Sequence, residues 1–161
     1  MLKIIKIADS EKRVITEKKE WKEIKDDIDT ENQYEYIEKL EEISKPKSEL
    51  INKELKKKIS SYRSQDKTKK LYNKEQFVDL ETVINLLKTS KMCCYYCKKN
   101  VLLLYENLRE PRQWTLERLD NDYGHNKGNL EISCLKCNVD RKTMYHERFM
   151  FTKELKIIKT E

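Results

Sequence analysis

Two pairs of cysteines, each separated by two residues, constrain the fold of this chain more than any other feature. The pairs are Cys94-Tyr-Tyr-Cys97 and Cys134-Leu-Lys-Cys137. Four thiolates in this arrangement are typical of a tetrahedral zinc site. The separation between the pairs exceeds that of a compact zinc ribbon, so we expect a small folded unit between them. Cys93 could replace Cys94 as a ligand in a C-x3-C pair, but we favour Cys94.

The remaining composition predicts a small and mostly helical protein. Of the 161 residues, 40% are charged and 37% are hydrophobic, which suits one modest domain with an appendage. Only two glycines and two prolines are present, so few positions interrupt a helix. Both glycines lie in 121–129, the segment with the strongest loop composition. We expect no membrane-spanning helix, because no run of 18 apolar residues exists, and no secretory signal.

The charge is distributed unevenly. The chain carries a net charge of +6, and acidic residues outnumber basic ones only in residues 1–50. A basic region attracts polyanions such as nucleic acid. A solvated lysine-rich surface gives the same pattern, so charge alone leaves both interpretations open.

The first half of the chain predicts helices. Residues 1–7 and 13–16 could form a hairpin, and Pro46 is the best candidate for a domain boundary. We therefore predict a charged, helical N-terminal region at 1–46, able to bind a protein partner, and a second domain at 47–161. The remaining elements follow from apolar periodicity and loop composition: two helices within 17–44 broken near 29–31, a basic helix at 48–63, a loop at 64–70, and a helix at 79–89 capped by Asp79.

The pattern changes after the first cysteine pair. Short apolar or alternating runs predict strands at 101–105, 114–120 and 129–134, and a helix follows from Asn138. The order is cysteine pair, strand, loop, strand, cysteine pair and helix, which predicts a ββα unit clamped by a metal, with a core at about 91–150. The expected fold class is α+β.

Residues 94–142 resemble an HNH endonuclease domain of the ββα-metal group. The resemblance is to zinc-stapled members that occur as stand-alone proteins of phages and large DNA viruses, and it covers about a third of the chain. Its motifs are Trp-Thr-Leu-Glu-Arg-Leu-Asp-Asn, Gly-His-Asn-Lys-Gly-Asn and Cys-Leu-Lys-Cys-Asn. It implies a metal-dependent endonuclease that nicks or cuts DNA, with structural zinc and catalytic Mg²⁺ or Mn²⁺. It also implies an intracellular location, in cytoplasm or nucleus, or in the host cell if the protein is viral.

The family motif can be carried over at four positions. Asn129 matches the central asparagine, which helps to orient the general base and to fix the hairpin. Asn138 matches the last motif position, where histidine or asparagine coordinates the catalytic metal. Glu117 falls where the family has an aspartate ligand, and Arg118 falls where it has the histidine base. Because arginine does not accept a proton at neutral pH, the usual base is missing here.

Another group must then act as the base if the chain hydrolyses phosphodiester bonds. His125, in the loop between the motif strands, is the first candidate, although it can also be an ordinary loop histidine. Tyr123 is the second candidate. His146 is weaker, because the helical period turns it away from Asn138.

Oxygen ligands favour Mg²⁺ or Mn²⁺ at the catalytic position. The candidates are Glu117, Asp120 and Asn138. Strand alternation places Glu117 on the face opposite Arg118 and Asp120, so the two acids do not point at one ion in a regular strand. We keep both and favour Glu117. Arg118 is shaped to hold a phosphate through two hydrogen bonds.

Two functions remain open. The first is a DNA endonuclease with His125, Arg118 and Asn129 as its catalytic residues. The second is a catalytically inactive zinc module that binds nucleic acid or protein. In either case, the residues expected to contact DNA phosphates are Arg118, Lys127, Lys136, Arg141 and Lys142.

Overall fold

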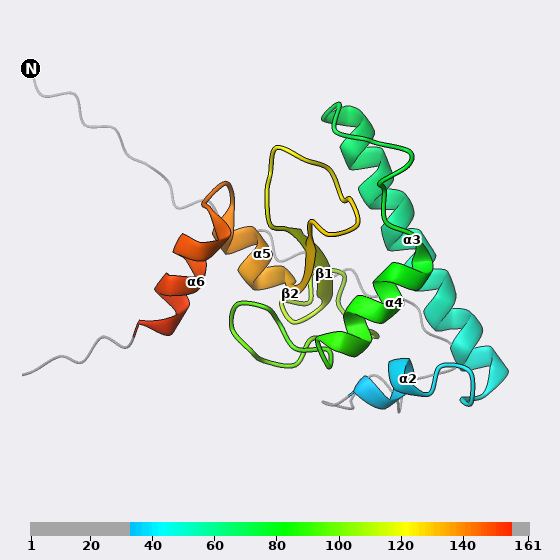
Figure 1. Cartoon of the computed structure of the whole chain (residues 1–161). Helices are drawn as coiled ribbons and strands as arrows, with labels where there is room; N and C mark the ends of the chain where they lie inside the picture. Colours follow the sequence, from blue (N-terminus) through cyan, green and yellow to red (C-terminus); the bar gives the residue numbers. More distant parts are fainter. Residues whose placement is uncertain (1–32, 156–161) are drawn as a thin grey trace, which may run out of the picture.

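The computed structural model describes residues 33–155 and has a mixed α+β fold, as the sequence predicts. A two-stranded antiparallel sheet lies between two groups of helices (Figure 1). The elements are α2 (Tyr34–Glu38), α3 (Lys45–Thr68), α4 (Leu80–Thr89), β1 (Trp114–Arg118), β2 (Leu130–Cys134), α5 (Leu135–Arg141) and α6 (His146–Glu154). The predicted hairpin of 1–7 with 13–16 and the first of the two helices predicted within 17–44 lie outside the described residues.

The hairpin confirms the predicted pair of strands. Strand β1 pairs with β2 from Trp114 opposite Cys134 to Arg118 opposite Leu130. Helix α5 begins directly after β2 and contacts both strands. In Figure 1, α5 and α6 lie on one side of the hairpin, and α3 and α4 lie on the other. The ββα order expected from the motifs is therefore present.

Helix α3 is longer at both ends than the sequence predicts. Pro46 lies in its first turn, where a missing backbone N–H leaves no helical hydrogen bond unmade. The helix continues through the predicted loop at 64–70 as far as Thr68. Its apolar stripe of Ile51, Leu55 and Ile59 is buried. Beyond the predicted end, Asp66 is also buried and bonds His125, and this tertiary contact favours a helix longer than local composition predicts.

Helix α4 forms as predicted. The Asp79 side chain accepts a hydrogen bond from the Thr82 backbone N–H at 2.8 Å, which satisfies a donor in the first turn. Val83 and Leu87 are fully buried on its inner face.

Two further predicted elements differ from the structure. Residues 101–105 do not form a β-strand, and Leu102 makes only an isolated bridge to Gln113. The Gln33 side chain instead satisfies this segment, because its Oε1 accepts from the N–H groups of Leu103 and Leu104. The helix predicted from Asn138 also ends early, at Arg141. Lys142 has a φ of 53°, which breaks the helix before α6 begins.

The predicted domain boundary near Pro46 does not coincide with a break in the packing. Ile37 and Leu40 belong to the same buried core as Leu87, Trp114 and Ile132. Side chains of the described part of the N-terminal region, 33–46, therefore pack into the same core as the hairpin. No helix in 33–155 combines the length and apolar character needed to cross a membrane.

Candidate metal centre and hairpin site

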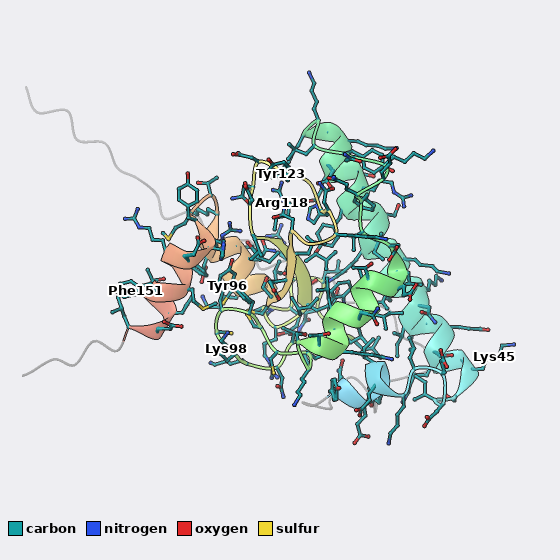
Figure 2. All side chains as sticks on the ribbon, viewed as in Figure 1. Lys45, Tyr96, Lys98, Arg118, Tyr123 and Phe151 are labelled. Atoms are coloured by element: carbon teal, nitrogen blue, oxygen red, sulfur yellow. The ribbon has the colours of Figure 1, made fainter. Side chains whose placement is uncertain are left out.

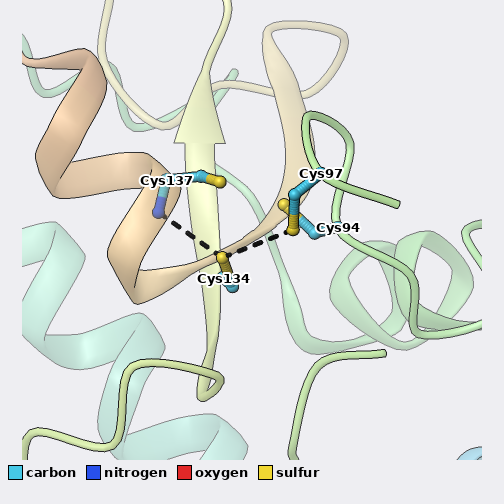
Figure 3. Close-up of side chains that lie close together, drawn as sticks. All are labelled: Cys94, Cys97, Cys134 and Cys137. Atoms are coloured by element: carbon cyan, nitrogen blue, oxygen red, sulfur yellow. Dashed lines mark hydrogen bonds between the residues drawn. The ribbon is translucent and has the colours of Figure 1, made fainter. Parts of the chain in front are cut away.

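The four paired cysteines meet at one point of the fold. Cys94 and Cys97 lie on a turn before the hairpin, Cys134 ends β2, and Cys137 lies in the first turn of α5 (Figure 3). Their sulfur atoms all lie within 4.8 Å of one another, so the group could hold a metal ion such as zinc. The fifth cysteine is not part of this group. The Cys93 sulfur lies 3.6 Å from the Asn100 side-chain oxygen, which agrees with the choice of Cys94.

The spacing of these sulfurs fits a tetrahedral ion. Four Zn–S bonds of about 2.3 Å place neighbouring sulfurs about 3.8 Å apart. The Cys97 and Cys134 sulfurs are 3.9 Å apart, and none of the five cysteines forms a disulfide. Three of the four side chains are buried, which shields the group from solvent.

Backbone amides prepare the group for a thiolate. The Cys137 N–H donates to the Cys134 sulfur at 3.4 Å. A hydrogen bond from the Cys134 thiol, together with N–H groups of the turn, lowers the pKa of Cys94 to about 4. The same bond and burial raise the pKa of Cys134. A cation bound among the four sulfurs would favour their thiolate forms.

Glu117, expected to bind the catalytic ion, is buried and paired. It is 3% exposed, and its Oε1 accepts a hydrogen bond from Nη1 of Arg141, which is also 3% exposed. Burial raises the pKa of Glu117, and the guanidinium of Arg141 acts in the opposite direction. Its second oxygen, Oε2, and the Tyr96 hydroxyl are both buried, and the Tyr96 side chain also acts to lower the pKa of Glu117.

Arg141 is held on all sides. Beyond Glu117, it donates to the carbonyl oxygens of Arg118, Leu119 and Met144 at 2.7 to 3.0 Å. These bonds fasten the end of α5 to the end of β1. The burial disfavours the predicted phosphate contact by Arg141, because its guanidinium is enclosed within the protein.

Asn138 lies where the motif predicts, on the face of α5 toward the hairpin. Its Nδ2 donates to the Thr115 hydroxyl at 3.1 Å and to the Leu116 carbonyl at 3.4 Å. Thr115 and Glu117 are two residues apart in β1 and so share one face. Asn138 and Arg141, one turn apart, both reach that face.

Asn129 and Arg118 shape the loop between the strands. The Asn129 side chain accepts from the Asp120 N–H at 2.9 Å and donates to the Asp120 carbonyl at 2.9 Å. Arg118 donates to the carbonyls of Asn121 and Tyr123, at 3.2 and 2.9 Å. Figure 2 shows Arg118 and Tyr123 together at the loop end of the hairpin. The side chains of Asn129 and Arg118 therefore both make hydrogen bonds that hold the loop closed.

His125 is paired with a residue that the sequence did not suggest. Its Nδ1 lies 2.7 Å from Oδ1 of Asp66 on α3, and its N–H donates to Oδ2 at 2.7 Å. His125 is 4% exposed, Asp66 is fully buried, and the Tyr62 ring packs 4.4 Å away. Burial lowers the pKa of His125, although Asp66 acts to raise it. No local sequence pattern indicates that Asp66 pairs with His125, because the two residues lie 59 positions apart in the chain.

The loop packs against α3 without spare room beside this pair. A methyl group added at Gly124 would lie 2.6 Å from the Asp66 carboxylate and from the Leu71 carbonyl. A glycine is therefore needed at 124 for close approach.

The other predicted side chains remain near the surface. Asp120 is exposed beside a hollow of about 400 Å³ whose lining includes Asp122, His146 and Glu147. Nε2 of His146 lies 3.0 Å from Oε1 of Glu147. Asn138 instead bonds Thr115 and Leu116. Tyr123 is 60% exposed. Lys127, Lys136 and Lys142 are exposed, and the first two pair with Asp79 and Asp140.

Among residues 33–155, the four cysteines are the one group of three or more histidine, cysteine or acidic side chains close enough to share an ion. Glu117 and Asp120 form no second group of this kind. Comparison of the chain with family models, curated proteins and solved structures finds no match in any of the three. The HNH resemblance therefore rests on the motif residues.

Proposed function

We propose that this chain is a DNA-binding protein built on a zinc-stapled hairpin and helix of the HNH type. The observation that carries the proposal is the pairing of Glu117 with Arg141. This pairing occupies the acid expected to bind the catalytic ion, while basic side chains of the loop and helix stay exposed. The geometry thus favours the binding function over hydrolysis.

Zinc is the ion that we propose the four cysteines bind. The donor set consists of four sulfurs, which favours zinc over Mg²⁺ or Mn²⁺. Metal analysis of the purified chain should give about one zinc per molecule. Cys94→Ser should lose most of it, and Cys93→Ser is the matched control that should keep it. Equal zinc loss in both variants would overturn the assignment of Cys94.

The DNA contacts are assigned to exposed lysines of the hairpin loop and of α5 with the turn after it. Lys127, Lys136 and Lys142 are exposed, and the ion pairs of the first two are solvent-accessible and therefore weak competitors for a phosphate. Contacts of this type bind the backbone without reading sequence.

Three features disfavour hydrolysis. Arg118 stands at the position of the general base and does not accept a proton at neutral pH. Glu117 is neutralised by an internal cation. His125 is buried and bound to Asp66. A water attacking a phosphate therefore lacks the base and the ion-binding acid that the family mechanism supplies.

The test combines binding and cleavage. Zinc-loaded protein should shift a labelled DNA duplex, and its affinity should fall steeply as salt rises. The same protein should leave supercoiled plasmid intact with Mg²⁺ or Mn²⁺. Failure to bind DNA at low salt would overturn the proposal, and nicking that depends on added Mn²⁺ would favour the second function below.

The second candidate is a metal-dependent endonuclease acting on DNA. The observation that favours it is the hollow beside Asp120, which also exposes Asp122 and Glu147 near the end of β1. In that case Asp120→Asn should lower plasmid cleavage at least about 100-fold. Asp140→Asn, on the exposed face of α5, is the control that should cleave like the wild type.

A further inference from the structure

A second hollow, of about 540 Å³, lies between α3 and the segment before α4. We call it the α3 hollow. Its floor includes Ile59, Phe77 and Val78, which are buried members of the core. Its basic lining residues come from three parts of the chain: Lys56, Arg63, Lys74 and Lys127.

The lining charges are predominantly positive. Four basic side chains face two acidic ones, Glu75 and Asp79. Asp79 is already engaged, because it caps α4 and pairs with Lys127. Hydrogen bonds from Lys127 and Thr82 hold the pKa of Asp79 well below its usual range, so it stays an anion with partners of its own. The hollow therefore suits an anionic ligand.

Aromatic rings hold two cations in place at this surface. The Arg63 guanidinium lies 5.3 Å from the centre of the Phe77 ring, and Lys67 Nζ lies 5.3 Å from the centre of the Tyr72 ring. The two rings pack at 5.4 Å. A guanidinium placed over a ring loses less conformational freedom when it binds a phosphate, and its flat face leaves N–H groups at its edge for oxygen atoms.

The α3 hollow is continuous with the hairpin loop. The Lys127 N–H donates to the Gln76 carbonyl at 2.8 Å, and the Val78 N–H donates to the His125 carbonyl at 2.9 Å. The loop in Figure 1 reaches toward the C-terminal end of α3, as the Asp66 and His125 contact requires. Lys127 belongs both to the hairpin loop and to the lining of the hollow, so a DNA strand bound at this lysine lies at the edge of the hollow.

We propose that the α3 hollow binds the phosphate backbone of DNA and extends the contact of the hairpin loop onto α3. The inference rests on the proposed function, since DNA is the ligand in both. It assigns binding to residues outside the ββα unit, with Arg63 and Lys74 as the central phosphate contacts. Phosphates are the chemistry that a cation-lined, solvent-open hollow recognises.

The test compares two double variants of the full, zinc-loaded chain by fluorescence anisotropy with a labelled duplex of about 20 base pairs. Arg63→Gln with Lys74→Gln removes two charges from the hollow. Lys45→Gln with Lys99→Gln removes two exposed charges elsewhere and is the matched control. The hollow variant should bind at least about 10-fold more weakly near 0.1 M salt, and its salt slope should fall by about 2. The control should change affinity less than about 2-fold.

The outcomes separate the inference from the proposed function. If wild type binds DNA and the hollow variant binds equally well, the inference is overturned and the proposed function stands. Equal weakening in both double variants overturns it too, because net charge then explains the effect. A wild type that binds no DNA overturns both. Arg63→Lys keeps the charge but lacks the flat guanidinium. A DNA affinity between those of the wild type and the double variant would support the role of the guanidinium. Unchanged melting temperatures confirm that the variants fold.

Discussion

At the scale of the residue, Arg141 determines what the acidic side chain of the hairpin can do. Its guanidinium lies beside Glu117, on the face of β1 that Asn138 also reaches. The sequence alone presents Glu117 as a candidate ion ligand and Arg141 as a phosphate contact. Each assignment is sensible when the residue is considered singly. The structure disfavours both assignments, because the two opposite charges meet in a buried place and neutralise each other. This proximity in the fold is not visible in the sequence.

Loss of Arg141 should therefore destabilise the fold. Arg141→Met leaves the Glu117 carboxylate buried without its partner, and we expect a cost of about 3 to 5 kcal/mol in the free energy of unfolding. Chemical denaturation measures this. Arg148→Met, at an exposed position of α6, is the control and should change stability by less than about 0.5 kcal/mol. An equal effect in both variants would contradict the role given to the buried pair.

His125 should make stability depend on pH. Its pKa is lowered in the folded state from an ordinary value of 6.5, so the unfolded chain binds more protons just below pH 6.5. The stabilisation is present above this pH and is lost as the pH falls, with a slope of at most about 1.4 kcal/mol per pH unit. Urea unfolding between pH 7.5 and 5.5 tests it. His125→Gln should flatten the slope, whereas His146→Gln leaves His125 in place and should not.

At the scale of the element, local signals predict helix α4 and the two strands well. Asp79 caps α4, and alternation marks both β1 and β2. The same signals fail where distant contacts determine the backbone. The 64–70 segment reads as a polar loop, yet Asp66 extends α3 to reach His125. Residues 101–105 read as a strand, yet a glutamine side chain accepts from the amides of Leu103 and Leu104.

Helix α2 should contribute to the stability of the whole domain. Ile37 is fully buried in the shared core, so Ile37→Ala should cost about 2 to 5 kcal/mol. Thermal or urea unfolding followed by circular dichroism measures the change. Leu155→Ala, at a position 53% exposed, is the control. Unchanged stability of the Ile37 variant would restore the boundary predicted near Pro46.

At the scale of the whole molecule, the cysteine group joins parts of the chain that are far apart in sequence. The turn at 94–97, the end of β2 and the start of α5 meet there (Figure 3). The C-x2-C spacing was sufficient to predict this meeting, because few other sequence patterns are so specific. The pairing of α3 with the hairpin loop has no such spacing signal, and only the folded chain reveals it.

Removal of the metal should loosen the hairpin and α5 together. With zinc bound, the chain should melt in one transition, and a strong chelator should lower the melting temperature by more than about 10 °C, because metal binding contributes directly to folding. Calorimetry with and without chelator measures it. Re-addition of zinc should restore the transition, and the Cys94→Ser variant should not respond. A chelator-treated chain with the same melting temperature would show that the cysteines pack without needing an ion.

The hydrogen bonds of Gln33 to the 101–105 segment should also slow the exchange of backbone amide hydrogens with solvent. Gln33 accepts from two backbone amides and donates to the carbonyl of Leu104, so one side chain takes the place of a neighbouring strand. The amide hydrogens of Leu103 and Leu104 therefore exchange with deuterium only when residue 33 detaches. The rate at those two positions would report how often the N-terminal side of the domain opens, without any label on the N-terminal region itself.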